Sequence, residues 1–158
     1  MKLPLPLPPP SQRRKFLAQS AGFIALFTLR PVLAVTQSPV LAGLVARFAG
    51  TSTVREGRVK LDISPLVENG NSVPIEVTVE SPMTGEQHVV AIAVFNEKNP
   101  QNDVAQFALT ALAGRAHVAT RIRLATTQQL VAVAKMNDGT CWTHTVDVLV
   151  TVASCTEE

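Results

Sequence analysis

The sequence predicts an all-β protein: an immunoglobulin-like antiparallel β-sandwich of about seven strands, with one short helix near its beginning. From residue 58 onward, apolar and polar residues alternate with the period of two that is typical of half-buried strands. Valine and threonine, which suit pleated surfaces, dominate these stretches. Turn-forming residues recur about every ten positions, a spacing that is typical of such sandwiches.

Residues 1–34 are typical of a twin-arginine signal peptide. Arg13 and Arg14 precede the weakly apolar stretch 18–29, and small residues lead to Ala34. The apolar stretch has 12 residues, whereas a helix needs roughly 20 to cross a bilayer. We therefore expect cleavage after Ala34, export to the periplasm and no membrane association of the mature chain. An uncleaved membrane anchor is the alternative.

The predicted signal peptide and the mature chain differ in net charge. The full sequence has 14 basic and 12 acidic residues, but five of the basic residues lie before residue 35. The mature chain therefore sets nine basic residues against all 12 acidic ones, a net charge of −3. It also has no basic patch with interleaved aromatic residues, which argues against nucleic acid as a partner.

Residues 35–57 are predicted to form an N-terminal helical segment. Between Pro39 and Ala49 the apolar residues recur at helical spacing and form one stripe: Val40, Leu41, Leu44, Val45 and Phe48. Gly50 is expected to end this helix. We expect the stripe to cap the sandwich, with docking on a partner protein as the alternative.

Residues 58–152 are predicted to form the sandwich itself. Strands are expected at 58–63, 73–79, 88–96, 104–110, 115–124, 128–136 and 141–152. The segment 88–96 is nearly all apolar, which is typical of a central strand covered on both faces. In the last strand, Trp142 and His144 are expected to face inward and Cys141 to face the other side. Trp142 is expected to fill part of the core.

No conventional enzyme site or metal site can be assembled from the sequence. His88, His117 and His144 have no histidine or cysteine partner at metal-ligand spacing. Glu76 and Glu80 alternate along one strand and are expected on a solvated face. We therefore expect no catalytic residue, no bound metal and no cofactor.

Cys155 lies beyond the last predicted strand, in the C-terminal tail 153–158. Terminal residues are poorly ordered unless something ties them down, so a cysteine there suits bonding or chemistry rather than packing. A disulfide with Cys141 is disfavoured, because the extended strand would separate the two by roughly 45 Å and a disulfide needs Cα atoms about 4.4–6.8 Å apart. Cys141 is expected to be a half-buried thiol or to lie at a subunit interface.

Several segments resemble the SoxY family, the sulfur-carrier subunits of the thiosulfate-oxidising Sox system. The segments that carry the resemblance are 60–63, 68–74, 80–84, 94–100, 120–125, 131–134 and 138–139. The resemblance implies a heterodimer with a SoxZ-like subunit and a sulfur-carrying cysteine at the position of Cys155. It also implies three transient partners: a SoxAX-like c-type cytochrome that conjugates thiosulfate to the thiol, a SoxB-like hydrolase that releases sulfate, and a SoxCD-like enzyme.

The tail departs from the pattern of this family. The family tail is similar to Gly-Gly-Cys-Gly-Gly, whereas here Cys155 stands between Ala153-Ser154 and Thr156-Glu157-Glu158. These neighbours are stiffer and wider than glycine, and the acidic ones disfavour a thiolate and repel thiosulfate. Three functions therefore stay open: a carrier with a divergent tail, a paralogue that serves another sulfur compound, and an assembly subunit whose cysteine is incidental.

Overall fold

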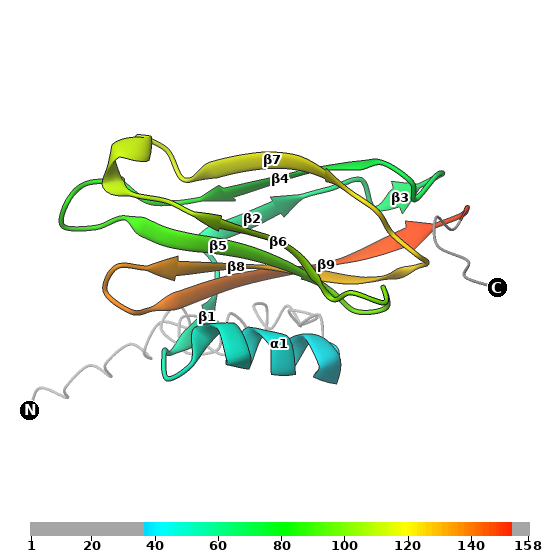
Figure 1. Cartoon of the computed structure of the whole chain (residues 1–158), viewed down its shortest axis with the longest axis horizontal. Coiled ribbons are helices and arrows are strands. Elements are labelled where there is room, and N and C mark those ends of the chain that lie inside the picture. Colours follow the sequence, from blue (N-terminus) through cyan, green and yellow to red (C-terminus); the bar gives the residue numbers. More distant parts are fainter. Residues whose placement is uncertain (1–36, 153–158) are drawn as a thin grey trace, which may run out of the picture. The chain divides into compact units, whose positions relative to one another are not determined.

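The computed structural model describes residues 37–152, which form one α-helix, a short 3-10 turn and nine strands (Figure 1). The predicted all-β sandwich is confirmed: all seven expected strands are present, and two short strands are added to them. The elements are α1 (Pro39–Ala49), β1 (Val54–Glu56), β2 (Val59–Asp62), β3 (Leu66–Val67), β4 (Val73–Val79), β5 (Val89–Asn96), β6 (Asp103–Ala108), η2 (Ala111–Ala113), β7 (His117–Ile122), β8 (Gln128–Met136) and β9 (Cys141–Val150). Among the described residues, no helix is long and apolar enough to span a membrane.

The strands form two facing sheets. The larger sheet has the order β1-β9-β8-β5-β6, with β3 also paired to β9, and the smaller sheet has the order β2-β4-β7. Strand β4 buries every second side chain, from Val73 to Val79, toward the larger sheet. There these side chains join the main core with Ile92, Val94 and Leu130, each of which is 0% exposed. Burial of this apolar area is the main force that holds the two sheets together.

Helix α1 covers the outer face of the larger sheet (Figure 1). Its buried side chains pack against Ala93, Phe95, Val131, Val133 and Cys141. The ring of Phe48 meets Phe95 edge-on, with centroids 6.0 Å apart. Strands β5 and β8 are therefore covered on both faces, and the expectation that the helix caps the sandwich is confirmed.

Two short strands that the sequence analysis missed pair with β9 and run parallel to it. In β1, Val54 lies opposite Cys141, and in β3, Leu66 lies opposite Leu149. Between them the chain leaves the larger sheet, adds β2 to the smaller sheet and returns. The fully antiparallel arrangement expected from the sequence is corrected at these two pairings, and β1 lies within the segment 35–57 that was expected to be helical. Strands of two or three residues carry too few positions for a readable period, so only long-range pairing defines them.

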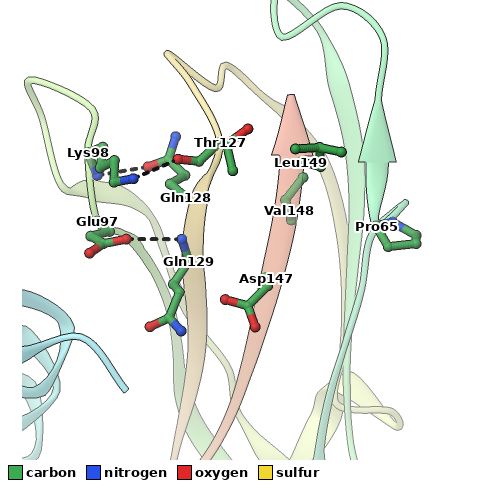
Figure 2. A pocket seen from close by; sticks show the side chains of 9 residues that line it. All are labelled: Pro65, Glu97, Lys98, Thr127, Gln128, Gln129, Asp147, Val148 and Leu149. Carbon is green, nitrogen blue, oxygen red and sulfur yellow. Dashed lines mark hydrogen bonds between the residues drawn. The ribbon is translucent and has the colours of Figure 1, made fainter. Parts of the chain in front are cut away.

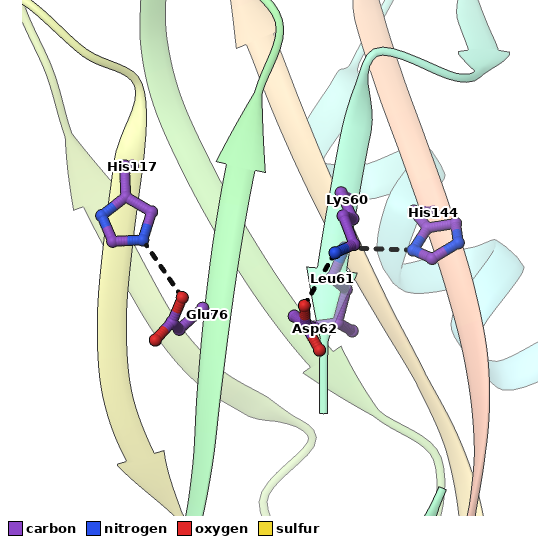
Figure 3. A network of polar contacts seen from close by, with 6 residues as sticks. All are labelled: Lys60, Leu61, Asp62, Glu76, His117 and His144. Atoms are coloured by element: carbon purple, nitrogen blue, oxygen red, sulfur yellow. Dashed lines mark hydrogen bonds and ion pairs between the residues drawn. The ribbon is translucent and has the colours of Figure 1, made fainter. Parts of the chain in front are cut away.

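His144 connects the two sheets where β2 passes β9 (Figure 3). Its Nδ1 accepts a hydrogen bond from the backbone N–H of Leu61 at 3.0 Å, and so occupies a donor on the free edge of β2. Trp142, two residues earlier, is half-buried against the core and is flanked by the guanidinium groups of Arg55 and Arg58, which lie 5.9 and 4.9 Å from its ring centroid. The inward orientation predicted for Trp142 and His144 is confirmed.

Candidate functional site

Strand β9 leads the chain to the end of the sandwich from which the tail departs. Cys155 lies outside the described residues, three positions beyond Val152. Hydrogen bonds hold the backbone at Thr151 and Val152: the N–H of Thr151 donates to the carbonyl of Val67, and the N–H of Gly70 donates to the carbonyl of Val152, both at 3.0 Å. Three residues span at most about 11 Å. Chain connectivity alone therefore keeps the Cys155 thiol close to this end of the sandwich.

Three exposed apolar residues lie near the root of the tail. Leu66, Leu149 and Val152 are 50%, 53% and 58% exposed, and they are three of the six large apolar residues that are exposed in the described part of the chain. Leu66 and Leu149 are register partners, so they lie side by side. Exposed apolar side chains that gather at one end of a molecule are typical of a surface on which another protein packs. We call these three residues the apolar patch.

An open hollow of about 420 Å³ has one residue of this patch, Leu149, in its lining (Figure 2). It lies between the end of β9, the start of β8 and the loop after β5, and it contains Glu97, Lys98 and Asp147. Oε2 of Glu97 accepts a hydrogen bond from the N–H of Gln129 at 3.3 Å, and Nζ of Lys98 donates to the carbonyl of Thr127 at 3.0 Å. Its two carboxylates outnumber its one ammonium group, so we call it the acidic hollow.

Asn99 ties two loops together at the same end of the molecule. Its Nδ2 donates to the carbonyl of Arg123 at 2.8 Å. Its Oδ1 accepts from the N–H of Ala125 at 2.9 Å and from Nε2 of Gln128 at 2.8 Å. Two of the segments that carry the family resemblance, 94–100 and 120–125, are distant in sequence and meet through these bonds. Sequence reasoning did not assign a role to Asn99, because the bonding partners of an amide cannot be read from spacing.

Replacing Asn99 with alanine is expected to lower the free energy of unfolding by about 2–3 kcal/mol, because it removes three hydrogen bonds and leaves partners unsatisfied. One of these partners, Gln128, is only 3% exposed. Chemical denaturation measures the loss. Gln101→Ala, an exposed change in the same loop, is the control and is expected to stay within about 0.5 kcal/mol of wild type. Equal stability of the two variants would contradict the proposed cross-link.

The three histidines lie in separate places and do not form a joint site. Nε2 of His117 lies 3.5 Å from Oε2 of Glu76 on the exposed face of the smaller sheet (Figure 3). Nδ1 of His88 lies 3.0 Å from the carbonyl of Thr84. His144 lies between the two sheets, where it accepts a hydrogen bond from Leu61. Within residues 37–152, no group of three His, Cys, Asp or Glu side chains is placed to hold a metal ion. Glu76 and Glu80 are exposed, as expected from their strand positions.

Cys141 is a free cysteine that is 0% exposed, in the cluster formed by α1 and the larger sheet. This corrects the expectation of a half-buried or interfacial thiol, because the helix of the same chain covers it. Burial away from water raises the pKa of the Cys141 thiol. The group is therefore held in its neutral, unreactive form, since the thiolate is the nucleophile.

The two cysteines are expected to differ in their rate of thiol labelling. With a disulfide reagent such as DTNB, one thiol per native chain should react quickly and the second only after unfolding; Cys155→Ser should remove the fast phase. Because the folded pKa of Cys141 is raised, the folded state keeps a proton that the unfolded state releases above about pH 8.5. Its contribution makes the free energy of unfolding fall as pH rises through this range. Two fast-reacting thiols would contradict the burial of Cys141.

Comparison with known proteins gives a family. The model of the family described as sulfur oxidation protein SoxY matches residues 45–155, well over half of the chain, and the match ends at Cys155. The solved structure of the sulfur carrier protein SoxY from Chlorobium limicola f thiosulfatophilum is 26% identical, covers 72% of this chain and 97% of its own, and has a TM-score of 0.60. No curated protein matches the chain.

More distant solved structures share the fold. A superoxide reductase (neelaredoxin) from Ignicoccus hospitalis is 17% identical, over 60% of this chain and 80% of its own, with a TM-score of 0.53. A putative superoxide reductase from Thermotoga maritima is 21% identical, over 65% and 89% of the two chains, with a TM-score of 0.52. At such identities the likeness shows the sandwich architecture alone, since one fold hosts many functions.

Proposed function

Because this chain belongs to the SoxY family of sulfur oxidation proteins, we propose that it is a periplasmic sulfur carrier that holds thiosulfate-derived intermediates covalently on Cys155. The likeness to a solved sulfur carrier protein of this family supports a carrier rather than an enzyme. The observation that carries the proposal is the contrast between the two cysteines. Cys141 is buried beneath α1, whereas Cys155 follows the exposed Val152 by three residues and is the last residue of the family match.

The chemistry needs one accessible thiol and no catalytic group from this chain. The Cys155 thiol joins the outer sulfur of thiosulfate to form a cysteine S-thiosulfonate, which releases one proton and two electrons to a c-type cytochrome partner. Hydrolysis by a second partner then breaks the bond to the sulfonate group, releases sulfate and leaves a persulfide on Cys155. Because this chain contributes only the attachment sulfur, its carrier role calls for no metal and no cofactor.

The partners of the proposed cycle need surfaces at the tail end of the sandwich. A stable SoxZ-like subunit is proposed as the permanent partner, and SoxAX-like, SoxB-like and SoxCD-like enzymes as transient ones. The apolar patch of Leu66, Leu149 and Val152 lies near the root of the tail, so an enzyme that receives Cys155 would meet this patch. Such contacts are expected to be brief, because each ordered tail residue costs about 1–2 kcal/mol of backbone entropy.

The proposal is tested by intact-mass spectrometry of the mature protein from cells grown on thiosulfate, with and without reductant. Reductant-sensitive sulfur or thiosulfonate adducts that map to Cys155 are expected. An unmodified thiol, or only a disulfide between proteins, would overturn the carrier proposal and support an assembly subunit.

The non-glycine tail favours a second candidate, a SoxY-like paralogue that serves another sulfur compound. Thr156 and the two glutamates after it replace the small uncharged residues of the family pattern. Installing Gly-Gly-Cys-Gly-Gly around Cys155 separates the two candidates. If thiosulfate turnover rises markedly, the native tail is poorly matched to thiosulfate-processing enzymes and the paralogue is favoured. If turnover is unchanged or falls, thiosulfate is the native cargo.

Export is tested separately from carriage. The mature periplasmic protein is expected to begin at Val35, and Arg13→Lys with Arg14→Lys is expected to leave the uncleaved chain in the cytoplasm. Cell fractionation with intact-mass measurement checks both results. Efficient export of the double variant would contradict the twin-arginine route, and Lys15→Arg serves as the matched control because it keeps the charge beside the pair.

A further inference from the structure

A second open hollow, of about 410 Å³, lies at the tail end of the sandwich and has the opposite charge character to the acidic hollow. The end of β7 and the residue after it contribute two exposed arginines, Arg121 and Arg123. The acidic residue in the lining, Asp103, is already paired: its Oδ2 lies 3.6 Å from Nη2 of Arg47. The hollow therefore presents two cations that are not neutralised by its own carboxylate. We call it the arginine hollow.

The two guanidinium groups have few partners of their own. Nη1 of Arg121 makes only long hydrogen bonds to Ser72, 3.4 Å to the carbonyl and 3.3 Å to Oγ. Within residues 37–152, the Arg123 side chain makes no hydrogen bond or ion pair; only its carbonyl is used, as an acceptor for Asn99. Arginine presents five donors in a planar fork that fits a carboxylate, so this pair is suited to binding two carboxylates.

The root of the tail lies beside these arginines. Gly70 bridges the two places: its N–H donates to the carbonyl of Val152 at 3.0 Å, and its carbonyl accepts from the N–H of Leu124 at 2.9 Å. Only Gly70 therefore lies between Val152 and Leu124, which follows Arg123 in the sequence. The carbonyl of Val152 and the N–H of Leu124 are at most about 10 Å apart. Glu157 is five residues beyond Val152, within a reach of roughly 17 Å.

Charge decides which hollow the tail meets. The tail carries Glu157 and Glu158 and no basic residue. The acidic hollow sets Glu97 and Asp147 against one cation, Lys98, whereas the arginine hollow sets two arginines against one carboxylate. Over distances within a Debye length of about 8–10 Å, the tail is repelled from that side and attracted to the arginines. Both interactions act within one chain, where a short linker gives an effective concentration in the millimolar range.

We propose that Glu157 and Glu158 dock on Arg121 and Arg123, so that the acidic end of the tail is held over the arginine hollow. Docking places Cys155, two residues before Glu157, beside the tail root and offsets the two negative charges that disfavour its thiolate. The arginines would thus restore reactivity toward an anionic sulfur compound that the acidic tail alone would suppress. The effect on the reactivity of Cys155 rests on the proposed carrier function, whereas the contact between the tail and the two arginines does not.

A nitroxide spin label on Cys155 of the mature chain tests the contact, because buried Cys141 is protected from the reagent. At low ionic strength, we expect the strongest paramagnetic broadening at amides 99–103 and 121–125. The broadening should fall several-fold at high salt, in Glu157→Gln with Glu158→Gln, and in Arg121→Gln with Arg123→Gln. Arg115→Gln is the matched control, because Arg115 is an exposed arginine just before β7. It should leave the pattern of paramagnetic broadening unchanged.

Charge reversal gives the stricter result. Arg121→Glu with Arg123→Glu should reduce the broadening to the level that chain connectivity alone gives, and adding Glu157→Lys with Glu158→Lys should restore it. Broadening that is insensitive to all of these changes, or that centres on Glu97 and Asp147, would overturn the inference. Sulfur adducts on Cys155 without this contact would overturn only the docking, and the contact without adducts would overturn only the carrier function.

Discussion

Replacing Cys155 with serine is expected to abolish sulfur carriage completely while the domain stays folded. A hydroxyl group cannot form the sulfur–sulfur bond on which the proposed cycle depends, and Cys155 lies beyond the last described residue, Val152. No packing or hydrogen bond within residues 37–152 is removed by the change. Intact-mass spectrometry measures the adducts, and circular dichroism with thermal unfolding measures the fold.

Cys141→Ala is the matched control for this variant. It should keep full sulfur loading, because the Cys141 thiol is 0% exposed and held neutral by burial. It should lose at most about 1–2 kcal/mol of stability from the small cavity that it leaves under α1. Loss of loading in Cys141→Ala, with intact folding, would assign the attachment to the buried cysteine instead.

Replacing Phe95 with alanine is expected to produce the largest loss of stability in this chain, about 3–5 kcal/mol. Phe95 is 2% exposed and is among the largest fully packed side chains between α1 and the larger sheet. Its loss removes the edge-on contact with Phe48 and leaves a cavity beside strand β8. Denaturant unfolding measures the change in free energy.

Labelling of Cys141 and a control variant test the Phe95→Ala prediction further. Since Phe95 and Cys141 belong to the same cluster, loosening α1 should expose Cys141, and its labelling should accelerate well before global unfolding. Leu112→Ala is the control: Leu112 is 96% exposed, so its truncation should cost less than about 0.5 kcal/mol and leave Cys141 protected. Slow labelling in Phe95→Ala would mean that the helix is held mainly by other contacts.

The local elements of this protein could be predicted from the sequence because each has a readable period. The stripe between Pro39 and Ala49 predicted α1 with the observed bounds, and 128–136 predicted β8 in the same way. The strict alternation from Val73 to Val79 predicted β4 and the face that it buries. In each case the pattern covers at least seven residues, which is enough for one face to be distinguished from the other.

The ends of strands and the shortest strands were harder to predict. The last strand was expected to continue to Val152 but ends at Val150; beyond it, the chain is held by hydrogen bonds with Val67 at the end of β3 and with Gly70 in the loop that follows. Pairing partners of β1 and β3 lie more than 80 residues away along the chain. No local pattern of two or three residues specifies such a pairing, since the energy comes from contacts that exist only in the folded chain.

By itself, the sequence determined the class of fold, the position of the capping helix, the family resemblance and Cys155 as the candidate attachment residue. Each of these depends on residue types and on spacing along one stretch of chain. Only the tertiary structure decided that Cys141 is sealed beneath α1, that Asn99 joins two loops, and that Arg121 and Arg123 lie beside the root of the acidic tail. These relations join residues that are far apart in sequence, so burial and charge at the tail end are set by how the strands are brought together and not by the order of residues along any one of them.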